Sequence, residues 1–505
     1  MPGKKRTTLS TAQQFDHIII GGGTAGAIVA ARLAQAGRRI ALFEAGPSDE
    51  ETPRVLELRA WQALLESDLD FDYRIAPQAR GNGRIRHARG KVLGGCSSHN
   101  SCIAFDAPDE DLDAWAAAGA AGWTADEVRP FFARVREEVH VEPPGSDNAF
   151  GRDFIAAAQA YGLPAGALIV DGVLRRGVNW TDLNKRGNLR QSSSVAYLHP
   201  LRQWDDRLTI YTGQYIPRLL VEQGRVTGVE SADGPLRCAG DVILSCGAFD
   251  SPTLLMRSGI GPAEHLRGLG LDVVRDIPGV GEHLLDHPEG VITWETTRPL
   301  PPETANYWEI VLFEMTRAGL ASPDLMFHLG YQVFDMHTAP SGYPTAAHGF
   351  SLTPNVTRAR SQGVVRLRSA DPVVPPFIDF RYFTDPDGHD ERVMTTGLKI
   401  AREIVRQAPL EPWIKWELAP GPDVTDDEAL SDYVRATANT VYHPAGTCKM
   451  GAAADPLAVV DGELRVHGLA GLRIADASVF PSMIAVNPCL TVMMIGERCA
   501  EFVLK

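Results

Sequence analysis

The sequence predicts a two-domain α/β fold, in which a domain with a parallel sheet is interrupted by a second domain with an antiparallel sheet. Residues 16–46 contain an apolar β-branched run, a glycine-rich turn, an Ala-rich helical stretch and a second apolar run, which is the order of a βαβ unit. Residues 292–385 alternate β-type runs with Pro-rich connections, as an antiparallel sheet does. Segments typical of the first domain return in the middle and near the end of the chain, so we expect that domain to be discontinuous.

The glycines after the first apolar run have the spacing Gly21-x-Gly23-x-x-Gly26. Gly21 makes the tight turn, Gly23 lets backbone approach a pyrophosphate, and Gly26 lets the helix pack closely on the strand. Glu44 ends the second strand 18 residues beyond Gly26, where a carboxylate accepts hydrogen bonds from a ribose. This Rossmann-type segment predicts dinucleotide binding and serves FAD and NAD alike. The residues predicted to bind the dinucleotide here are Gly21, Gly23, Thr24, Ala25, Gly26 and Glu44.

Length and composition limit the class of protein. A chain of 505 residues is too long for one core and predicts two or three domains. Its 44% hydrophobic and 22% charged residues are typical of a soluble globular protein and exclude a disordered chain. The net charge of −14 argues against nucleic acid as a partner, because an acidic surface repels phosphate backbones.

Signals for membranes, secretion and metals are missing from the sequence. It holds no run of roughly 18 uncharged apolar residues, and residues 1–14 lack the apolar core of a secretory signal. The seven cysteines are odd in number and form no CxxC pair. They suit a reducing cytoplasm and support neither a disulfide framework nor a zinc site, so no metal is predicted.

Five ordered segments resemble the glucose–methanol–choline oxidoreductases. They are GGGTAGAIVAARLA, GKVLGGCSSHNS, GAFDSPTLLMRSGIGP, PGVGEHLLDHP, and the C-terminal HPAGTCKMG with ASVFPSMIAVNPCLT. The resemblance implies FAD rather than NAD, and a flavin domain joined to a six-stranded substrate sheet flanked by helices. The expected domains are residues 1–130, 200–288 and 432–505 for FAD, and residues 131–199 and 289–431 for the substrate.

Within that family, the chain is most similar to the members that oxidise choline. In those members the GGCSSHNS segment carries a histidine joined covalently to the flavin 8α-methyl, and His99 matches it. Ser101 would lie near the flavin N5 and the reacting hydroxyl. Without the resemblance, a buried and unlinked histidine is the simpler interpretation of His99. Further residues implied at the flavin are Gly95, Asn100, Asp476 and Pro488.

The resemblance also implies a catalytic set. His443 matches the family's catalytic histidine, and imidazole suits this role because its ordinary pKa near 6.5 lets it exchange protons near neutrality. Asn487 matches a position that holds His or Asn, and its amide can donate to an oxyanion but cannot take a proton. His328 matches a pocket histidine that would position the substrate, although a histidine in an apolar strand is more often a core residue.

A cation site is implied as well. Glu289 matches the carboxylate that faces the trimethylammonium head in the choline-oxidising members. A quaternary ammonium donates no strong hydrogen bond, so it is recognised by aromatic faces and a nearby negative charge. Each residue alone has an ordinary structural explanation, and their joint presence favours choline. The residues implied to line this pocket are Trp61, Trp308, Phe334, Val441 and Tyr442.

The sequence thus predicts a cytoplasmic, homodimeric FAD-dependent oxidase that converts choline to betaine aldehyde and on to glycine betaine, with dioxygen reduced to hydrogen peroxide. One alternative is an oxidase or dehydrogenase of another primary alcohol that passes electrons to a quinone or another acceptor. Others are a flavin-containing hydroxynitrile lyase and a purely structural flavin protein. Asp106 stands where an aromatic residue is expected, and the stretch from His99 to Glu289 is shorter than the family pattern, which leaves loops, substrate access and subunit contacts open.

Overall fold

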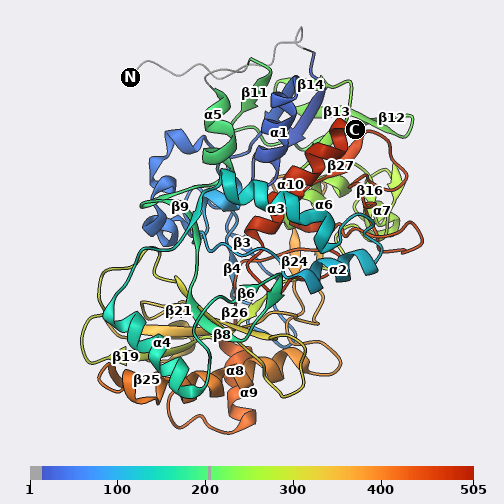
Figure 1. The fold of residues 1–505 in the computed structure, drawn as a ribbon. Helices are drawn as coiled ribbons and strands as arrows, with labels where there is room; N and C mark the ends of the chain where they lie inside the picture. The colour runs from blue at the N-terminus through green and yellow to red at the C-terminus, as the bar shows by residue number, and fades with distance from the viewer. Residues whose placement is uncertain (1–13, 203–205) are drawn as a thin grey trace.

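The computed structural model describes residues 14–202 and 206–505. Figure 1 shows an elongated molecule with a parallel sheet at one end and an antiparallel sheet at the other. This arrangement confirms the predicted α/β fold class with two kinds of sheet. The prediction that the N-terminus is no secretory signal concerns residues 1–13, which lie outside the described residues.

The parallel sheet has five strands, and all of its neighbouring pairs are parallel. In spatial order they are β11 (Leu208–Tyr211), β2 (Ile40–Phe43), β1 (His17–Ile20), β15 (Val242–Leu244) and β27 (Leu472–Ile474). β1, β2, β15 and β27 are apolar runs buried on both faces, as strands between two layers of helices must be. The sheet therefore draws strands from the beginning, middle and end of the chain, as the sequence predicts.

Two helices lie side by side against this sheet. The crossover helix α1 (Gly26–Gln35) joins β1 to β2, and α10 (Cys489–Leu504) packs on α1. The approach is close because α10 presents Gly496, where a Cβ would lie 2.9 Å from the carbonyl oxygen of Ala25. The last helix of the chain is thereby held beside the glycine-rich turn of the first βαβ unit.

The antiparallel sheet contains six strands in one path and two short ones beside it. The path is β25 (Ile414–Ala419), β19 (Ile292–Thr296), β22 (Gly349–Val356), β21 (Leu325–Gly330), β20 (Ile310–Glu314) and β8 (Gly177–Trp180). The short strand β18 (Pro288–Glu289) pairs with β22 and with β26 (Asn439–Thr440). Helices α4 (Ala149–Tyr161), α8 (His389–Val405) and α9 (Asp427–Thr437) lie at the outer end of the molecule in Figure 1.

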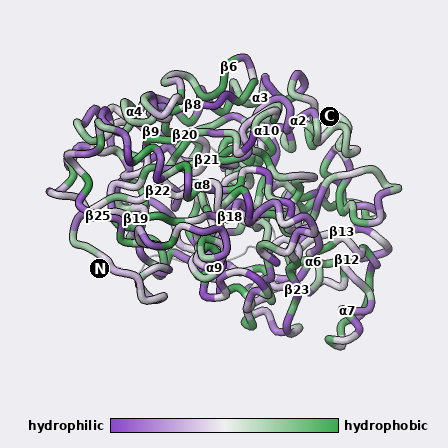
Figure 2. The backbone as a smooth tube through the Cα atoms, turned by 90° about the horizontal axis from the view of Figure 1, so that it is seen from below, coloured by the Kyte–Doolittle hydropathy of each residue, from purple (hydrophilic) through white to green (hydrophobic). Residues whose placement is uncertain are grey.

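Alternation along the inner strands separates the two faces of this sheet. Leu325, Phe327 and Leu329 of β21 pack into the core shared with α4 and α8. Met326, between them, packs into the core shared with the parallel sheet, and His328 lies on that same side of the strand. In Figure 2, the green of hydrophobic residues marks parts of the chain around β20 and β21. Because successive side chains alternate, an apolar strand can place one polar side chain toward the other half of the molecule.

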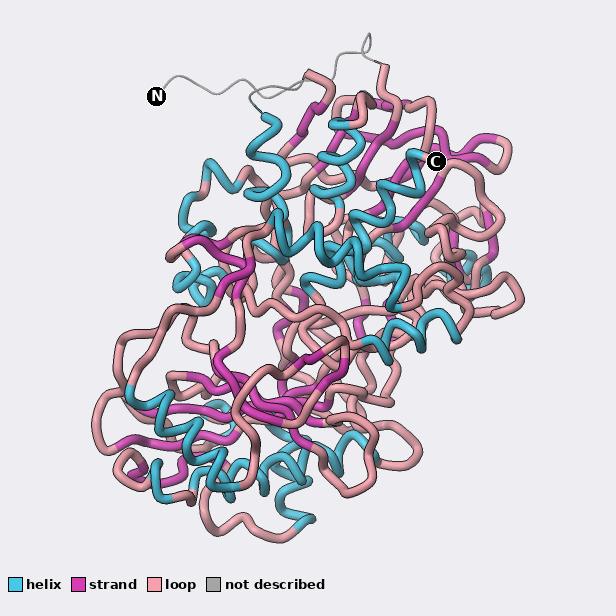
Figure 3. The backbone as a smooth tube through the Cα atoms, in the orientation of Figure 1, coloured by secondary structure: helices cyan, strands magenta, loops and turns pink. Residues whose placement is uncertain are grey.

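Figure 3 shows that loops join most of the remaining elements. The other helices are α2 (Asp109–Ala117), α3 (Ala125–Glu138), α5 (His199–Arg202), α6 (Gly247–Arg257) and α7 (Ala263–Gly268). The other strands are β3 (Tyr73–Arg74), β4 (Arg86–His87), β5 (Val141–Glu142), β6 (Ile169–Val170), β7 (Val173–Leu174), β9 (Leu183–Arg186), β10 (Leu189–Arg190), β12 (Arg218–Glu222), β13 (Arg225–Ser231), β14 (Gly234–Arg237), β16 (Ile260–Gly261), β17 (Arg275–Asp276), β23 (Val364–Arg366) and β24 (Phe377–Asp379).

The sequence also predicts helices over residues 109–140 that carry Trp123. It predicts a turn at Gln223 that joins two strand-like runs within residues 208–230, and a helix that starts at Pro252. The structure differs from each of these in detail. Trp123 lies in the turn between α2 and α3 rather than on a helix, where its indole N–H donates to the carbonyl of Gly462. The polar turn at Gln223 joins β12 to β13, whereas the earlier run at Leu208–Tyr211 belongs to the parallel sheet. Pro252 lies inside α6 instead of starting it.

Three further sequence expectations concern what the described part of the chain contains. No helix within it is long and apolar enough to cross a membrane. All seven cysteines lie within it and are free thiols. No cluster of three or more His, Cys, Asp or Glu side chains arranged to hold a metal ion occurs among these residues.

Candidate active site

A cavity lies between the two sheets, and its wall is drawn from both. It is bounded by the ends of β1 and β2 on one side and by β18 and β21 on the other. All predicted site residues line it except Gly26. They are Gly21, Gly23, Thr24, Ala25, Glu44, Trp61, Gly95, His99, Asn100, Ser101, Glu289, Trp308, His328, Phe334, Val441, Tyr442, His443, Asp476, Asn487 and Pro488.

The structure shows different physical reasons why each of the three motif positions is a glycine. A Cβ on Gly21, which has φ of 95°, would lie 2.3 Å from the carbonyl oxygen of Ser245, and a Cβ on Gly26 would lie 2.0 Å from the carbonyl oxygen of Gly21. Both must be glycine for the turn and helix to pack. A Cβ on Gly23 would meet nothing of the protein nearer than 3.8 Å, although Gly23 lines the cavity. Its missing side chain therefore leaves room for a ligand.

Three helices begin at the wall of the cavity, and two of them, α1 and α6, begin beside the glycine-rich turn. The residues just before the first turns of α1, α6 and α10 are Ala25, Cys246 and Pro488, and all three line the cavity. Asp476 holds the start of α6, because its Oδ2 accepts from the backbone N–H of Gly247 (2.9 Å) and from Oγ of Ser251 (2.6 Å). Helix N-termini carry partial positive charge, so this end favours an anionic group such as a pyrophosphate.

Glu44 fastens the glycine-rich turn. Its Oε2 accepts from the backbone N–H of Gly22 at 3.0 Å, and its Oε1 accepts from the backbone N–H of Gly46 at 2.8 Å. Burial raises the pKa of this carboxyl to about 7 against the opposing effect of these donors. Glu44 thus has a structural task that its sequence position does not reveal, beside the predicted contact with a ribose.

The segment with His99 crosses the middle of the cavity. Gly95 lies against the glycine-rich turn, since a Cβ on it would be 2.7 Å from the Cα of Gly23. The His99 ring is buried, and its Nε2 lies 3.1 Å from the carbonyl oxygen of Leu64. Burial lowers the pKa of His99 to about 4, which keeps the imidazole neutral and nucleophilic.

His443 is held in one tautomer by a second histidine, His287. Nε2 of His287 lies 2.9 Å and 2.8 Å from the carbonyl oxygens of Thr357 and Ile484, which can only accept, so this nitrogen carries the proton. Burial lowers the pKa of His287 to about 4, so the ring is neutral and its Nδ1 is an acceptor. Nδ1 of His443, 2.9 Å away, must then donate to it. The remaining nitrogen of His443, Nε2, is left with a free lone pair.

That free nitrogen belongs to a group of polar atoms without full partners. Nδ2 of Asn487 lies 3.5 Å from Nε2 of His443, and Oδ1 of the same amide is buried with no hydrogen-bond partner among the described residues. Burial lowers the pKa of His443 well below its ordinary value, with smaller effects from neighbouring His287 and His328. A neutral imidazole beside an amide donor can take a proton from a hydroxyl while the amide holds the oxygen.

His328 enters the same space from β21. Nδ2 of Asn355 lies 3.5 Å from its Nδ1, and its Nε2 makes no hydrogen bond of good geometry within the described chain. Burial lowers the pKa of His328 to about 4, while contact with Asn487 raises it less. Ser101 lines the cavity opposite, and its carbonyl accepts from Nδ2 of Asn306 at 2.6 Å.

Aromatic rings form the next part of the wall. The rings of Trp61 and Trp308 are 6.5 Å apart at 68°, and those of Trp308 and Phe334 are 5.4 Å apart at 83°. The indole N–H of Trp61 donates to the carbonyl of Asn306 at 3.0 Å, whereas that of Trp308 is buried without a partner among the described residues. Val441 and Tyr442 complete this side.

Glu289 is an acidic residue in the wall of this pocket. On β18 it pairs with Asn355 of β22 and with Asn439 of β26, so it lies inside the sheet. Burial raises the pKa of the carboxyl to about 8, and contacts with Thr353 and Asn439 lower it less. A cation placed beside this carboxyl would favour its charged form.

Reasoning from the sequence missed His287. The signal was present, because His287 stands two residues before Glu289 in the DHPEG stretch. What the sequence could not show is that the ring of His287 lies against that of His443, with their centroids 5.1 Å apart at 81°.

The fold and the cavity define a dinucleotide-dependent oxidoreductase, and comparisons with known proteins specify which kind. Residues 15–289 and 359–496 match the two family models described as GMC oxidoreductase. The chain belongs to the GMC oxidoreductase family. It is therefore an FAD-dependent oxidoreductase that acts on a CH–OH donor, and the glycine-lined, helix-capped end of the cavity fits that cofactor.

Individual relatives extend over nearly the whole chain. Choline oxidase of Arthrobacter globiformis is 48% identical, with 97% of this chain and 94% of the relative covered. Oxygen-dependent choline dehydrogenase of Rhizobium etli is 32% identical, with 97% and 96% covered. Among solved structures, pyridoxine 4-oxidase from Mesorbium loti has a TM-score of 0.89 at 30% identity, with 97% and 99% covered.

Proposed function

We propose that this enzyme oxidises choline to betaine aldehyde and, in a second round on the hydrated aldehyde, to glycine betaine, with dioxygen reduced to hydrogen peroxide in each round. The observation that carries the proposal is a buried carboxylate among aromatic rings in the same cavity as a histidine with a free nitrogen. The 48% identity to a choline oxidase supports the same substrate and acceptor.

In this proposal the two ends of choline are held by different groups. The trimethylammonium head lies against Trp61, Trp308, Phe334 and Tyr442, close to the Glu289 carboxylate. Attraction to the aromatic faces and to the charge compensates for the loss of water around the cation. Val441, two residues before His443 in the chain, also lines the cavity.

The hydroxyl end is activated by His443. Its Nε2 takes the hydroxyl proton, while Asn487 and Ser101 donate hydrogen bonds to the oxygen as it becomes an alkoxide, and His328 keeps that end of the substrate in place. His287 keeps Nε2 of His443 unprotonated beforehand, because it takes the hydrogen bond from Nδ1. FAD, when bound, supplies the hydride acceptor for the carbinol carbon.

We further propose that FAD is attached through His99. The buried, neutral imidazole lines the cavity in the segment that matches the linkage site of the family. The other proposed contacts to FAD are Gly21, Gly23, Thr24, Ala25, Glu44, Gly95, Asn100, Ser101, Asp476 and Pro488, while Gly26 supports the site through the close packing of α1. Acid precipitation tests the link, and we expect flavin to stay with the parent protein and to be released from His99→Ala. Free flavin from the parent would contradict it.

The domain limits, a homodimeric state and a cytoplasmic location, all expected from the sequence, remain predictions.

A flavin spectrum with choline, first without oxygen and then with it, tests the function. We expect anaerobic choline to bleach the flavin, and air to restore the colour with release of peroxide. An unbleached flavin would contradict the proposal and leave lyase or structural roles. Bleaching without recovery in air would favour a dehydrogenase with another acceptor, and bleaching by uncharged alcohols alone would refute the cation site.

A further inference from the structure

The catalytic histidine lies in an irregular piece of strand pairing. Two segments run antiparallel to one another, and Leu285 pairs with Ala445 while Pro288 pairs with Thr440. Two residues lie between the paired positions on one segment and four lie between them on the other, so the second segment carries two extra residues. Extra residues of this kind form a bulge, which re-aims side chains away from the pairing pattern.

The bulge contains Tyr442 and His443, and its backbone is held in an uncommon conformation. Tyr442 has φ of 64°, a left-handed value that a bulky side chain rarely adopts. Tyr442 and His443 both line the cavity; the ring of Tyr442 lies 5.6 Å from that of His87, and His443 lies beside Asn487. Contacts from outside the bulge must therefore keep it in this shape.

A single buried carboxylate, Asp286, makes most of those contacts. Its Oδ1 accepts from the backbone N–H of His443 at 3.0 Å, which the bulge leaves without a strand partner. Its Oδ2 accepts from Oγ1 of Thr440 at 2.6 Å and from the hydroxyl of Tyr382 at 2.5 Å. Oγ1 of Thr440 in turn accepts from the backbone N–H of Tyr442 at 2.8 Å.

Two further contacts complete the arrangement. The guanidinium of Arg89 donates to the carbonyl oxygen of Tyr442. His287, next to Asp286 in the chain, contacts the ring of His443, so one dipeptide contacts both the backbone and the imidazole of the catalytic residue. Asp286 is 4% exposed, and in this structure it accepts three hydrogen bonds from protein donors.

We propose that Asp286 is a positioning residue that holds the bulge, and thereby sets Tyr442 in the cation pocket and His443 at the hydroxyl together. The inference rests on the proposed function for what these two side chains do. It deepens that function, because it couples cation binding to proton removal through one carboxylate. Loss of Asp286 then weakens both steps, whereas loss of either side chain alone weakens mainly one.

Two variants at position 286 test this with flavin-loaded protein. Asp286→Ala removes the acceptor, and we expect kcat/KM for choline to fall about 100-fold, shared between a lower kcat and a higher KM, as displacement of a reacting group by about 1 Å does. The dissociation constant of tetramethylammonium, a cation that cannot react, rises about tenfold in the same variant. Asp286→Asn keeps an oxygen for the His443 N–H, while its NH₂ can donate to the hydroxyl oxygens of Thr440 and Tyr382. We therefore expect Asp286→Asn to recover most of the kcat/KM and of the tetramethylammonium affinity that Asp286→Ala loses.

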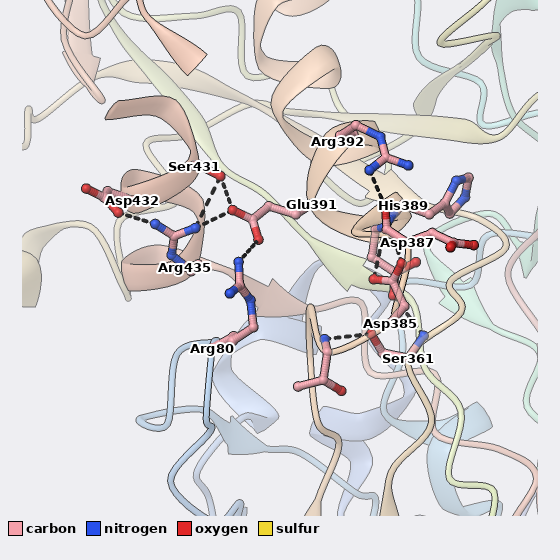
Figure 4. Close-up of polar contacts among 12 residues, drawn as sticks. Arg80, Ser361, Asp385, Asp387, His389, Glu391, Arg392, Ser431, Asp432 and Arg435 are labelled. Carbon is pink, nitrogen blue, oxygen red and sulfur yellow. Dashed lines mark hydrogen bonds and ion pairs between the residues drawn. The ribbon is translucent and has the colours of Figure 1, made fainter. Parts of the chain in front are cut away.

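Asp390 provides a matched control. It is also fully buried, and its two carboxylate oxygens accept from the backbone N–H groups of Arg360 (2.8 Å) and Ser361 (2.9 Å). It stands in the first turn of α8, between His389 and Glu391 in the chain, both of which Figure 4 labels, and it does not line the cavity. We expect Asp390→Ala to lower the melting temperature while kcat and tetramethylammonium binding stay within about threefold of the parent.

Several results would overturn the inference. One is a folded, flavin-loaded Asp286→Ala enzyme with parental kcat and cation affinity, and another is a lower kcat with unchanged cation binding. Should Asp286→Ala fail to fold, Thr440→Val tests the same contacts, and parental values there would overturn the inference equally. Failure of the parent enzyme to oxidise choline contradicts the proposed function instead, and the variants are then compared on the alcohol that the parent does oxidise.

Discussion

The two ends of the cavity differ in whether backbone or side chains form the wall. The dinucleotide end is mostly backbone, with glycines at its turns and the first turns of α1 and α6 beside them. The alcohol end is mostly side chains, and its buried groups Glu289, His328 and His443 all have shifted pKa values. The difference teaches that a pyrophosphate can be bound by backbone N–H groups from one short motif, whereas a cation and a proton need particular side chains from distant segments.

Both ends contain buried polar atoms without partners among the described residues, Ser245 Oγ being one at the dinucleotide end, but the ends differ in which groups have partners. At the dinucleotide end, Glu44 and Asp476 accept hydrogen bonds from the backbone that shapes the site. At the alcohol end, Oδ1 of Asn487 and Nε1 of Trp308 are buried without partners among the described residues. Buried polar atoms usually have a hydrogen-bond partner, so those of the cavity wall are candidates to contact a ligand.

The largest expected effect is at the alcohol end. His443→Ala removes the free Nε2 that takes the hydroxyl proton, so we expect anaerobic flavin reduction by choline to slow about 10³-fold. Stopped-flow spectroscopy measures this rate. Flavin content stays at the parental level, because His443 contributes nothing to the glycine-lined end. Flavin reduction at the parental rate would contradict the role of His443 as the group that takes the proton at the alcohol end.

Charge at the alcohol end is expected to matter next. Glu289→Gln should raise the KM for choline about 100-fold, or about 2.7 kcal/mol, because a buried carboxylate no longer attracts the cation. The uncharged isostere 3,3-dimethylbutan-1-ol is the control substrate, and its KM should change little. Equal losses for both substrates would mean that Glu289 shapes the pocket rather than selecting a charge.

At the dinucleotide end, substitutions at two glycines of one motif should have different effects, one on stability and the other on cofactor binding. Gly26→Ala places a Cβ 2.0 Å from a backbone oxygen, and we expect the free energy of unfolding to fall by about 1–3 kcal/mol. Gly23→Ala meets nothing of the protein within 3.8 Å, so its apoprotein should melt like the parent while its flavin-to-protein absorbance ratio falls. Thermal unfolding and that ratio distinguish the two; parental flavin content in Gly23→Ala would contradict the ligand interpretation.

The smallest effect is a pH dependence of binding. The pKa of Glu289 is raised to about 8 by burial, so the free pocket is neutral below that pH and charged above it. Choline favours the charged form, hence KM should fall up to about tenfold per pH unit as pH rises toward 8, and then level off. Initial rates across this range test it. In Glu289→Gln the slope disappears; a slope that persists there would assign it to another group.

Prediction from sequence succeeded where function depends on a short, continuous motif. Gly21, Gly23 and Gly26 with Glu44 predicted the βαβ unit, and the ordered motifs predicted the family and the fold class. The gathering of Glu289, His328 and His443 in one cavity agrees with the residues that the family resemblance singled out. Their roles stay predictions until the experiments above are done.

The sequence by itself determined the dinucleotide turn, the family and the residue types available for chemistry, because these depend on neighbours in the chain. Only the tertiary structure decided the protonation of His443, since that depends on His287 and on the carbonyls of Thr357 and Ile484. It likewise decided the raised pKa of Glu289, which comes from burial inside a sheet. Proton positions and buried charges depend on what surrounds a group in space, and those surroundings come from segments far apart in the sequence.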